Sequence, residues 1–303
     1  MGGAVTPWSK PAQVDHDGGW SDWPAPAKVN LFLHIVGRRD DGYHLLQTAF
    51  QLLDFGDTVR LRPRDDGRIV RLDPLPDVDP DVDLTVRAAR VLALETGCSL
   101  GADIALDKRI PMGGGLGGGS SDAATVLVAL DALWKTCLGT PALAAIGLAL
   151  GADVPVFVRG ASAWAEGIGE QLTPLDVPES WFVVVDPGVR VPTAALFQDP
   201  DLTRSAAHLT IPLFASGAET VNVFEPVVRE RFPAVARALD WLQTRAPARL
   251  SGSGGCIFAR AASRELAEAI VNECPAEFRA FTARGLATSP LHARVLEWRE
   301  ARV

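Results

Sequence analysis

The chain has 303 residues, of which 48% are hydrophobic and 22% are charged, a composition sufficient for one large or two ordinary globular domains. Its formal net charge is −8, and lysine and arginine form no cluster, which argues against a nucleic-acid-binding surface or a basic membrane face. No segment has the apolar length of a membrane span, and the first residues lack the pattern of a secretory signal. We therefore expect a cytoplasmic protein.

The cysteines and histidines give no indication of a metal site. The cysteines, at positions 98, 137, 256 and 274, are far apart and form no CxxC pair, so we expect buried, reduced thiols. The five histidines are scattered without the spacing of metal ligands, so we expect no structural metal.

The first ordered element is predicted to be a strand. Residues 1–21 are rich in Gly, Pro and Asp and predict a disordered extension, so that the ordered chain begins near Trp23. In the segment 27–35, AKVNLFLHI, aliphatic residues alternate with other residues, which predicts a strand with one buried face. Lys28 and Asn30 share the face opposite the aliphatic row.

The next segments alternate between strands and turns. Residues 37–44 form a polar turn, and residues 46–72 predict further strands. A loop rich in Pro and Asp follows at 73–83. The segment 84–97 has helical apolar spacing and a terminal glycine, and 102–110 alternates as a strand that runs into a glycine-rich stretch.

Helices and strands then follow each other to the end of the chain. Residues 120–134 predict a strong helix, with serines placed to cap it and Asp122 in its first turn. The next segments predict a helix at 141–149, a strand at 154–160, a hairpin within 162–172 and a buried strand at 181–188. The last third predicts a helix at 225–245, a strand near 256–260 and a helix at 263–273.

The glycine-rich stretch PMGGGLGGGSSDAA, residues 111–124, lies between a predicted strand and a predicted helix. Free N–H groups and the helix dipole make such a junction an anion-binding pocket. The stretch is not an ordinary P-loop, because Ser120 stands where that motif requires lysine. Its glycines also match the dinucleotide pattern GxGxxG, as any glycine run would, but no clear acidic partner ends the next strand. A flexible surface loop is the remaining alternative.

The same stretch resembles the second signature of the GHMP kinases, the family of galactokinase and of homoserine, mevalonate and phosphomevalonate kinases. The segments 26–57, 108–130, 150–160 and 249–259 together resemble the branch of this family whose substrate carries a cytidine diphosphate group. The resemblance implies an α+β fold of two domains, with the active site in the cleft between them. We expect the N-terminal ATP-binding domain at 22–178 and the C-terminal domain at 179–303.

The resemblance also implies ATP and Mg²⁺ as cofactors. The residues that match the ATP-binding signature are Pro111, Met112, Gly113, Gly114, Gly115, Leu116, Gly117, Gly118, Gly119, Ser120 and Ser121. The magnesium ligands are not evident from the sequence, and Ser120 or Ser121 is the candidate for one of them.

Two charged residues match the catalytic positions of the family. Asp153, in GADVPVF, matches the catalytic aspartate, although its spacing alone suggests a cap or turn residue. Lys28, which alone would be a solvated charge, matches the lysine of the segment PAKxN. The resemblance implies that Asp153 takes the proton of the acceptor hydroxyl while Lys28 stabilises the moving charge, so the two side chains should lie within about 6 Å.

Further matches concern the phosphate acceptor, a small molecule that ends in cytidine diphosphate. Asn30 matches a substrate-facing asparagine, and a pair formed by Tyr43 and Phe197 would sandwich the cytosine ring. The remaining matches are His44, Thr193, Gly252, Ser253 and Gly254. One position departs from the family, because Asp83 stands where an asparagine near the nucleotide base is usual.

The implied reaction is ATP-dependent phosphorylation of the acceptor's 2-hydroxyl group in the non-mevalonate route to isoprenoids, by a monomer or homodimer that binds neither nucleic acid nor membrane. Three alternatives stay open. They are another GHMP kinase acting on a sugar, homoserine or a mevalonate-type alcohol, a nucleotide sensor without turnover, and a dinucleotide-dependent oxidoreductase.

Overall fold

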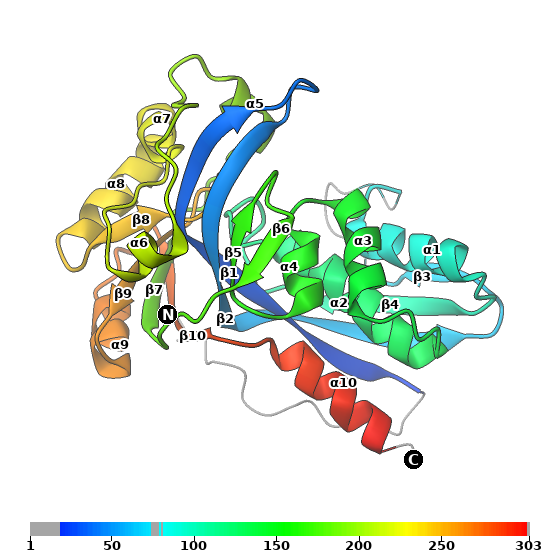
Figure 1. Cartoon of the computed structure of the whole chain (residues 1–303). Helices are drawn as coiled ribbons and strands as arrows, with labels where there is room; N and C mark the ends of the chain where they lie inside the picture. The colour runs from blue at the N-terminus through cyan, green and yellow to red at the C-terminus, as the bar shows by residue number, and fades with distance from the viewer. Residues whose placement is uncertain (1–18, 74–78, 80, 302–303) are drawn as a thin grey trace.

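Two long strands connect the two halves of the molecule (Figure 1). The computed structural model describes residues 19–73, 79 and 81–301. Strand β1 (Ser21–Arg38) pairs antiparallel with β2 (His44–Arg64) along nearly its whole length, with register shifts that bend the pair. The start of β1 contributes Trp23 to one hydrophobic core, and its end contributes Ile35 to another. The strand that carries Lys28 therefore belongs to both halves.

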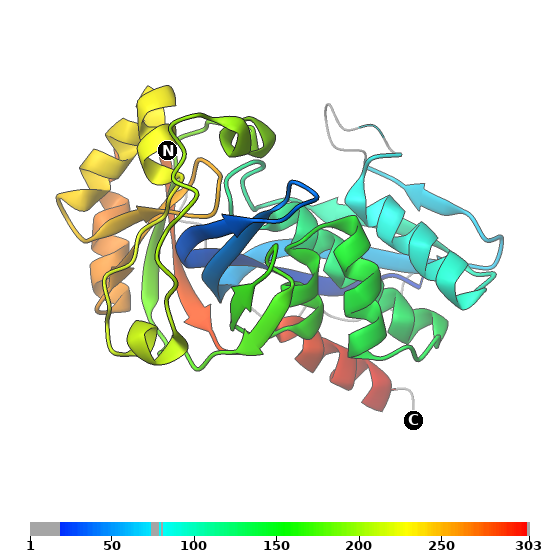
Figure 2. The same ribbon diagram turned by 45° about the horizontal axis from the view of Figure 1, so that its top comes forward.

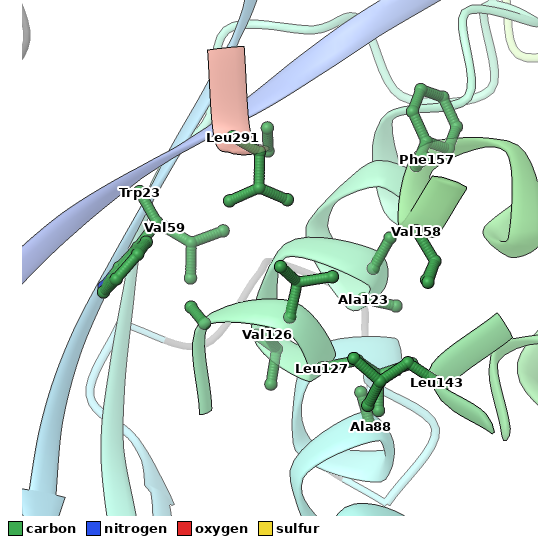
Figure 3. Packing of buried hydrophobic residues seen from close by; sticks show 14 of the residues in the cluster. Trp23, Val59, Ala88, Ala123, Val126, Leu127, Leu143, Phe157, Val158 and Leu291 are labelled. Atoms are coloured by element: carbon green, nitrogen blue, oxygen red, sulfur yellow. The ribbon is translucent and has the colours of Figure 1, made fainter. Parts of the chain in front are cut away.

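The first half is a layer of helices on one face of the sheet, at the end opposite α7, α8 and α9 (Figure 2). Leu127 and Phe157 from these helices belong to the same hydrophobic core as Val59 of β2 (Figure 3). The elements of this half are β3 (Ile69–Arg71), α1 (Leu84–Thr96), β4 (Gly101–Asp107), α2 (Gly118–Trp134), α3 (Thr140–Leu150), α4 (Val154–Arg159), β5 (Ala163–Glu166) and β6 (Gln171–Pro174).

The second half continues the same sheet, whose strand order is β3-β4-β2-β10-β7-β9-β8. Strand β10 joins the halves, because it pairs with β2 at Gly285 and Leu286 and with β7 over the rest of its length. The elements of this half are β7 (Trp181–Asp186), α5 (Thr193–Gln198), α6 (Ile211–Ala215), α7 (Glu225–Arg231), α8 (Pro233–Gln243), β8 (Ala248–Leu250), β9 (Ile257–Ala261), α9 (Arg264–Asn272) and β10 (Arg279–Leu286).

The last helix, α10 (Pro290–Glu300), returns to the first half. Its residues Leu291, Val295 and Trp298 belong to the core that contains Trp23, and the rings of Trp23 and Trp298 lie 5.5 Å apart. The sequence places this segment in a C-terminal domain, whereas its packing is with the N-terminal half. The boundary at residues 178 and 179 stays a prediction.

The predicted strand at 154–160 is wrong, because the residues form helix α4. A short apolar run with β-branched residues resembles a buried strand, and periodicity alone cannot separate the two. Pro155 lies in the first turn, where its missing N–H costs nothing. Val154, Val156, Phe157 and Val158 are all buried in the same core, which removes the polar face that would identify a helix.

The predicted start of helix α2 is also wrong. The helix begins at Gly118, and the cap is Gly117, which makes no side-chain hydrogen bond. Gly117 has φ 74°, and a Cβ there would lie 2.7 Å from the ring of Phe157. The helix therefore starts two residues before Ser120, directly after a cap position where any side chain would be strained, and Asp122 lies in the second turn.

The expectation of buried, reduced cysteines is met in part. All four cysteines are free, but only Cys256 is buried, and Cys137 is exposed. Residues 1–18 of the predicted extension and most of the predicted loop at 73–83 lie outside the described residues, while Ser21 already begins β1. Among the described residues, no helix is long and apolar enough to cross a membrane.

Candidate active site

Most of the predicted site residues converge on one cavity of about 540 Å³. Its wall is formed by β1, the glycine-rich loop at 111–117, the start of α2, and the loop before α4. The second half contributes α5 and the loop at 251–255, so the cavity lies between the two halves.

The glycine-rich loop is locked to the loop at 251–255. The N–H of Cys256 donates to the carbonyl oxygen of Gly114 at 3.0 Å, and the N–H of Gly255 donates to that of Gly113 at 3.4 Å. A Cβ on Gly115 would lie 2.0 Å from the carbonyl oxygen of Ser251. The sequence explains the glycines by the approach of phosphate, and the structure adds a second reason, the approach of another backbone.

Lys28 lies at the centre of the cavity wall and is 2% exposed. A register shift between Pro26 and Lys28 bends β1 here, and the N–H of Lys28 donates to Leu116 O at 3.0 Å. Its Nζ donates to Gly115 O at 3.0 Å and to Asn30 Oδ1. The side chain is therefore fixed by the glycine-rich loop and by its own strand.

Asp153 pairs with Lys28, with 3.3 Å between Oδ2 and Nζ. The expected distance of about 6 Å or less is confirmed. Asp153 precedes α4 without capping it by its side chain, and that side chain is 34% exposed whereas that of Lys28 is 3% exposed. A molecule in the cavity would therefore meet the carboxylate, with the ammonium group behind it.

Asn30 links the two strands behind Lys28. Its Nδ2 donates to Thr48 Oγ1 on β2 at 2.9 Å, and its own N–H donates to Ser251 Oγ at 3.4 Å. Thr48 also lines the cavity. The sequence pattern gave no reason to select Thr48, since a threonine in a strand is common.

A buried charge cluster at the end of β4 escaped the sequence analysis. Lys108 pairs with Asp57 at 2.5 Å and with Asp122 at 2.8 Å, and both Lys108 and Asp122 line the cavity. Asp57 Oδ1 also accepts from the N–H groups of Arg109 and Ile110 at 2.5 and 2.7 Å, which fixes the chain where it enters the glycine-rich loop. The position of Lys108 directly before that loop was the available signal.

The cluster has unusual protonation properties. Burial raises the pKa of Asp122, the nearby Asp57 raises it further, and Lys108 acts in the opposite direction without cancelling these effects. Burial lowers the pKa of Lys108, but the two carboxylates outweigh burial and leave it above its ordinary value. Asp122 Oδ1 has no hydrogen-bond partner among the described residues.

At the acceptor end of the cavity, the sandwich of cytosine between Tyr43 and Phe197 stays a prediction, and one ring contact is already present. The ring of His44, and not that of Tyr43, stacks on Phe197, with centroids 5.1 Å apart and 23° between the planes. Tyr43 is 60% exposed in the turn between β1 and β2. Burial lowers the pKa of His44, and the guanidinium groups of Arg204 and Arg38 lower it further, so the imidazole is neutral at pH 7.

Three other predicted acceptor residues line the cavity, one from the start of α5 and two from the loop at 251–255. Thr193 Oγ1 and Ser253 Oγ are 2.7 Å apart, and both line the cavity, as does Gly252. Gly254 does not line it, because it packs against the glycine-rich loop, where its Cβ would lie 2.0 Å from the nitrogen of Gly115.

The predicted ATP-binding stretch lines the cavity from Pro111 to Ser120, but Ser121 is fully buried outside the lining. Of the two serines named for Mg²⁺, only Ser120 therefore faces the cavity. In the described part of the chain, no three His, Cys, Asp or Glu side chains group closely enough to hold a metal. Asp83 caps α1 by accepting from Thr85 N at 2.8 Å, so its carboxylate has a structural role.

A glycine-rich anion pocket and a lysine–carboxylate pair in one cleft define a class of phosphate-transferring enzymes. Two family models match the chain, "GHMP kinases N terminal domain" at 83–161 and "GHMP kinases C terminal" at 201–280. The chain belongs to the GHMP kinase family of ATP-dependent kinases.

Within that family the chain is most informatively compared with 4-diphosphocytidyl-2-C-methyl-D-erythritol kinases. It is 57% identical to the kinase of that name from Halorhodospira halophila over 281 residues, 92% of this chain and 97% of the relative. It is also 57% identical to the one from Xanthomonas axonopodis pv. citri over 287 residues, 94% and 96% of the two chains.

Solved structures agree in fold. A crystal structure of 4-(cytidine 5'-diphospho)-2C-methyl-D-erythritol kinase has a TM-score of 0.75 and 34% identity, and the match covers 87% of this chain and 98% of the other. Homoserine kinase from Cytophaga hutchinsonii has a TM-score of 0.65 at 17% identity, with 92% and 98% covered, and shows the shared fold alone.

Proposed function

We propose that the protein transfers the γ-phosphate of ATP to the 2-hydroxyl group of 4-(cytidine 5′-diphospho)-2-C-methyl-D-erythritol, giving ADP and the 2-phosphate. The observation that carries the proposal is the Lys28–Asp153 pair, 3.3 Å apart in the cavity that the glycine-rich loop lines. The 57% identity to kinases named for this substrate supports the choice of acceptor. The reaction belongs to the non-mevalonate route to isoprenoids.

ATP is proposed to bind at residues 111–120, with its phosphates against the glycine-rich loop and the start of α2. The loop has its backbone, without side chains, on the cavity wall, and the N-terminus of a 17-residue helix adds a favourable dipole. This local field is needed because the net charge of −8 would otherwise repel the anion.

In the proposed reaction, Asp153 accepts the proton of the acceptor hydroxyl. The hydroxyl oxygen forms a bond to the γ-phosphorus before this proton has fully left, the bond from that phosphorus to the β–γ bridging oxygen breaks, and ADP leaves with the electron pair. A carboxylate is a weak base, but it suffices where the proton moves late, as in a loose phosphoryl-transfer transition state. Lys28 stabilises the charge that moves through the cavity.

The cytidine end of the acceptor is proposed to bind between Phe197 and the turn that carries Tyr43. Phe197 lines the cavity, and His44 beside it supplies a neutral imidazole that can donate or accept a hydrogen bond. Tyr43 is free to cover the cytosine because it is 60% exposed. Asn30, Thr193, Gly252 and Ser253 complete the proposed acceptor site.

Mg²⁺ is proposed as the second cofactor. The cavity offers one hard oxygen donor of the kind that suits this ion, the hydroxyl of Ser120, and phosphate and water would supply the remaining ligands. When bound, the ion would neutralise phosphate charge. We also propose that the protein acts in the cytoplasm, consistent with four free thiols, as a monomer or homodimer.

The test is ADP release with Mg-ATP and the cytidyl acceptor, comparing the wild type with Asp153→Asn. We expect turnover in the wild type and a loss of about 10²–10⁴-fold in kcat in the variant. Turnover that survives the substitution would remove Asp153 from the mechanism. Turnover only with an alcohol that lacks cytidine would favour the alternative, another GHMP small-molecule kinase.

A further inference from the structure

Asn222 lies in the connection between α6 and α7, outside every motif considered above. It is 3% exposed, and its side chain makes three hydrogen bonds. Its Nδ2 donates to Leu250 O at 2.9 Å and to Gly252 O at 2.7 Å. Its Oδ1 accepts from Phe224 N at 3.0 Å. Both N–H donors of the amide are therefore used on the loop at 251–255 and the strand before it.

The carbonyl group that Asn222 holds belongs to the residue packed against Lys28. Gly252 has φ 57°, and a Cβ there would lie 3.4 Å from Lys28 Nζ, 3.1 Å from Asn30 Oδ1 and 3.1 Å from Gly115 O. Gly252 therefore closes the wall behind the lysine. A shift of this residue would change the space available to Lys28 and the approach of the glycine-rich loop.

Asn222 is itself fixed to the strand that carries Lys28. The N–H of Leu33 donates to Val221 O at 3.0 Å, and the N–H of Val223 donates to Leu33 O at 2.9 Å, on either side of Asn222. The backbone of this segment is thus anchored to β1, and the side chain is anchored to the loop. The amide connects the two walls of the cavity that enclose Lys28.

We propose that Asn222 is a positioning residue for phosphoryl transfer. Its amide fixes the position of Gly252, and Gly252 in turn fixes the ammonium group of Lys28 relative to the glycine-rich loop. The inference rests on the proposed function of Lys28. An amide is required because the side chain donates both hydrogen bonds to the loop and the strand before it. A carboxylate cannot donate and would place an oxygen against two carbonyl oxygens. Asn222 does not line the cavity and touches no reacting atom.

Asn222→Asp tests the proposal with the least change of shape. The variant keeps an oxygen that can accept from Phe224 N and loses both donations to the loop. We expect kcat to fall about 100-fold, because a small displacement of a catalytic group costs that much, while KM for ATP changes little. Far-ultraviolet circular dichroism at the assay temperature measures the folded fraction, to which kcat is normalised.

Ser289→Ala is the control for stability. Ser289 is equally buried, at 3% exposure, and caps α10 away from the cavity. Its loss lowers Tm without changing kcat per folded molecule. If Asn222→Asp does not fold, Asn222→Ser, which keeps one donor, replaces it, and we expect kcat between those of the wild type and a Lys28 variant.

The outcomes are separable. A folded Asn222 variant with wild-type kcat would overturn the inference, as would a variant whose activity loss is fully explained by its folded fraction. Failure of the wild type on the cytidyl acceptor would instead overturn the proposed substrate. The Asn222 comparison would then be made with the alcohol that the wild type phosphorylates, and the same loss of kcat is expected.

Discussion

Gly115 and Gly254 are in direct backbone contact, since a Cβ on Gly254 would lie 2.0 Å from the nitrogen of Gly115. Two glycine loops that are 139 positions apart in sequence thus form one unit at the cavity. We predict that Gly254→Ala destabilises the protein by about 1–3 kcal/mol and removes activity, because one loop must move. Chemical denaturation measures the first effect and ADP release the second.

The matched control for that prediction is Gly119→Ala, in the glycine-rich stretch itself. The nearest atom to a Cβ on Gly119 is Leu84 Cδ1 at 3.5 Å, an ordinary contact. Its free energy of unfolding should stay near that of the wild type. Equal stability of both variants would show that the two loops are not tightly packed.

Replacement of the buried Lys28 should lower kcat strongly. Lys28→Met keeps most of the side-chain volume but removes the charge beside Asp153, so we expect kcat to fall about 10²–10³-fold. Steady-state kinetics measures the loss, and Lys135→Met, at an exposed lysine after α2, should have none. Wild-type kcat in Lys28→Met would exclude a role for this ammonium group.

The charge cluster at Lys108 predicts a pH dependence of stability. The pKa of Asp122 is raised in the folded protein, so above about pH 4 the folded state holds a proton that the unfolded chain has lost. The free energy of unfolding should therefore decrease as pH rises above this value, until the folded carboxyl also loses its proton. Urea denaturation between pH 5 and pH 9 is the measurement.

Asp122→Asn should weaken that pH dependence, because an amide does not titrate. At alkaline pH the variant should lose less stability than the wild type. Parallel curves for the two proteins would show that Asp122 does not hold the extra proton.

The acceptor site can be tested separately from the ATP site. Phe197→Ala removes the ring that His44 stacks on, and we expect KM for the cytidyl acceptor to rise about tenfold with little change in KM for ATP. Leu213→Ala, at a 52% exposed residue of α6, is the control. An equal rise in both KM values would place Phe197 outside the acceptor site.

The sequence alone predicts the parts of the site that lie within one segment. The alternation in 27–35 puts Lys28 and Asn30 on one face, and the strand–glycine–helix order places the anion pocket. The resemblance to a family joined Lys28 to Asp153, which are too distant in sequence for any local pattern to connect. The sequence analysis did not predict the ion pairs of Lys108 with Asp57 and Asp122, because these pairs depend on how β2, β4 and α2 meet.

Helix α4 is a case in which the local sequence pattern predicted the wrong secondary structure. Its six residues carry the composition of a strand, and five of them are buried, which leaves no alternation of polar and apolar faces to identify the helix. The stacking of His44 on Phe197 is another contact that the sequence did not predict. Neighbouring residues at a turn point in different directions, and the sequence does not show which ring turns inward.

The return of β10 and α10 to the first half determines how a fragment of the chain would behave when it is expressed alone. A fragment that ends at residue 178 would lack Leu291, Val295 and Trp298, and would expose the side of Trp23 that they cover. It would also leave Leu52 and Leu53 of β2 without the backbone partners that β10 provides. Truncation from the C-terminus should therefore destabilise the half that carries the glycine-rich loop, although the removed residues are distant from it in sequence.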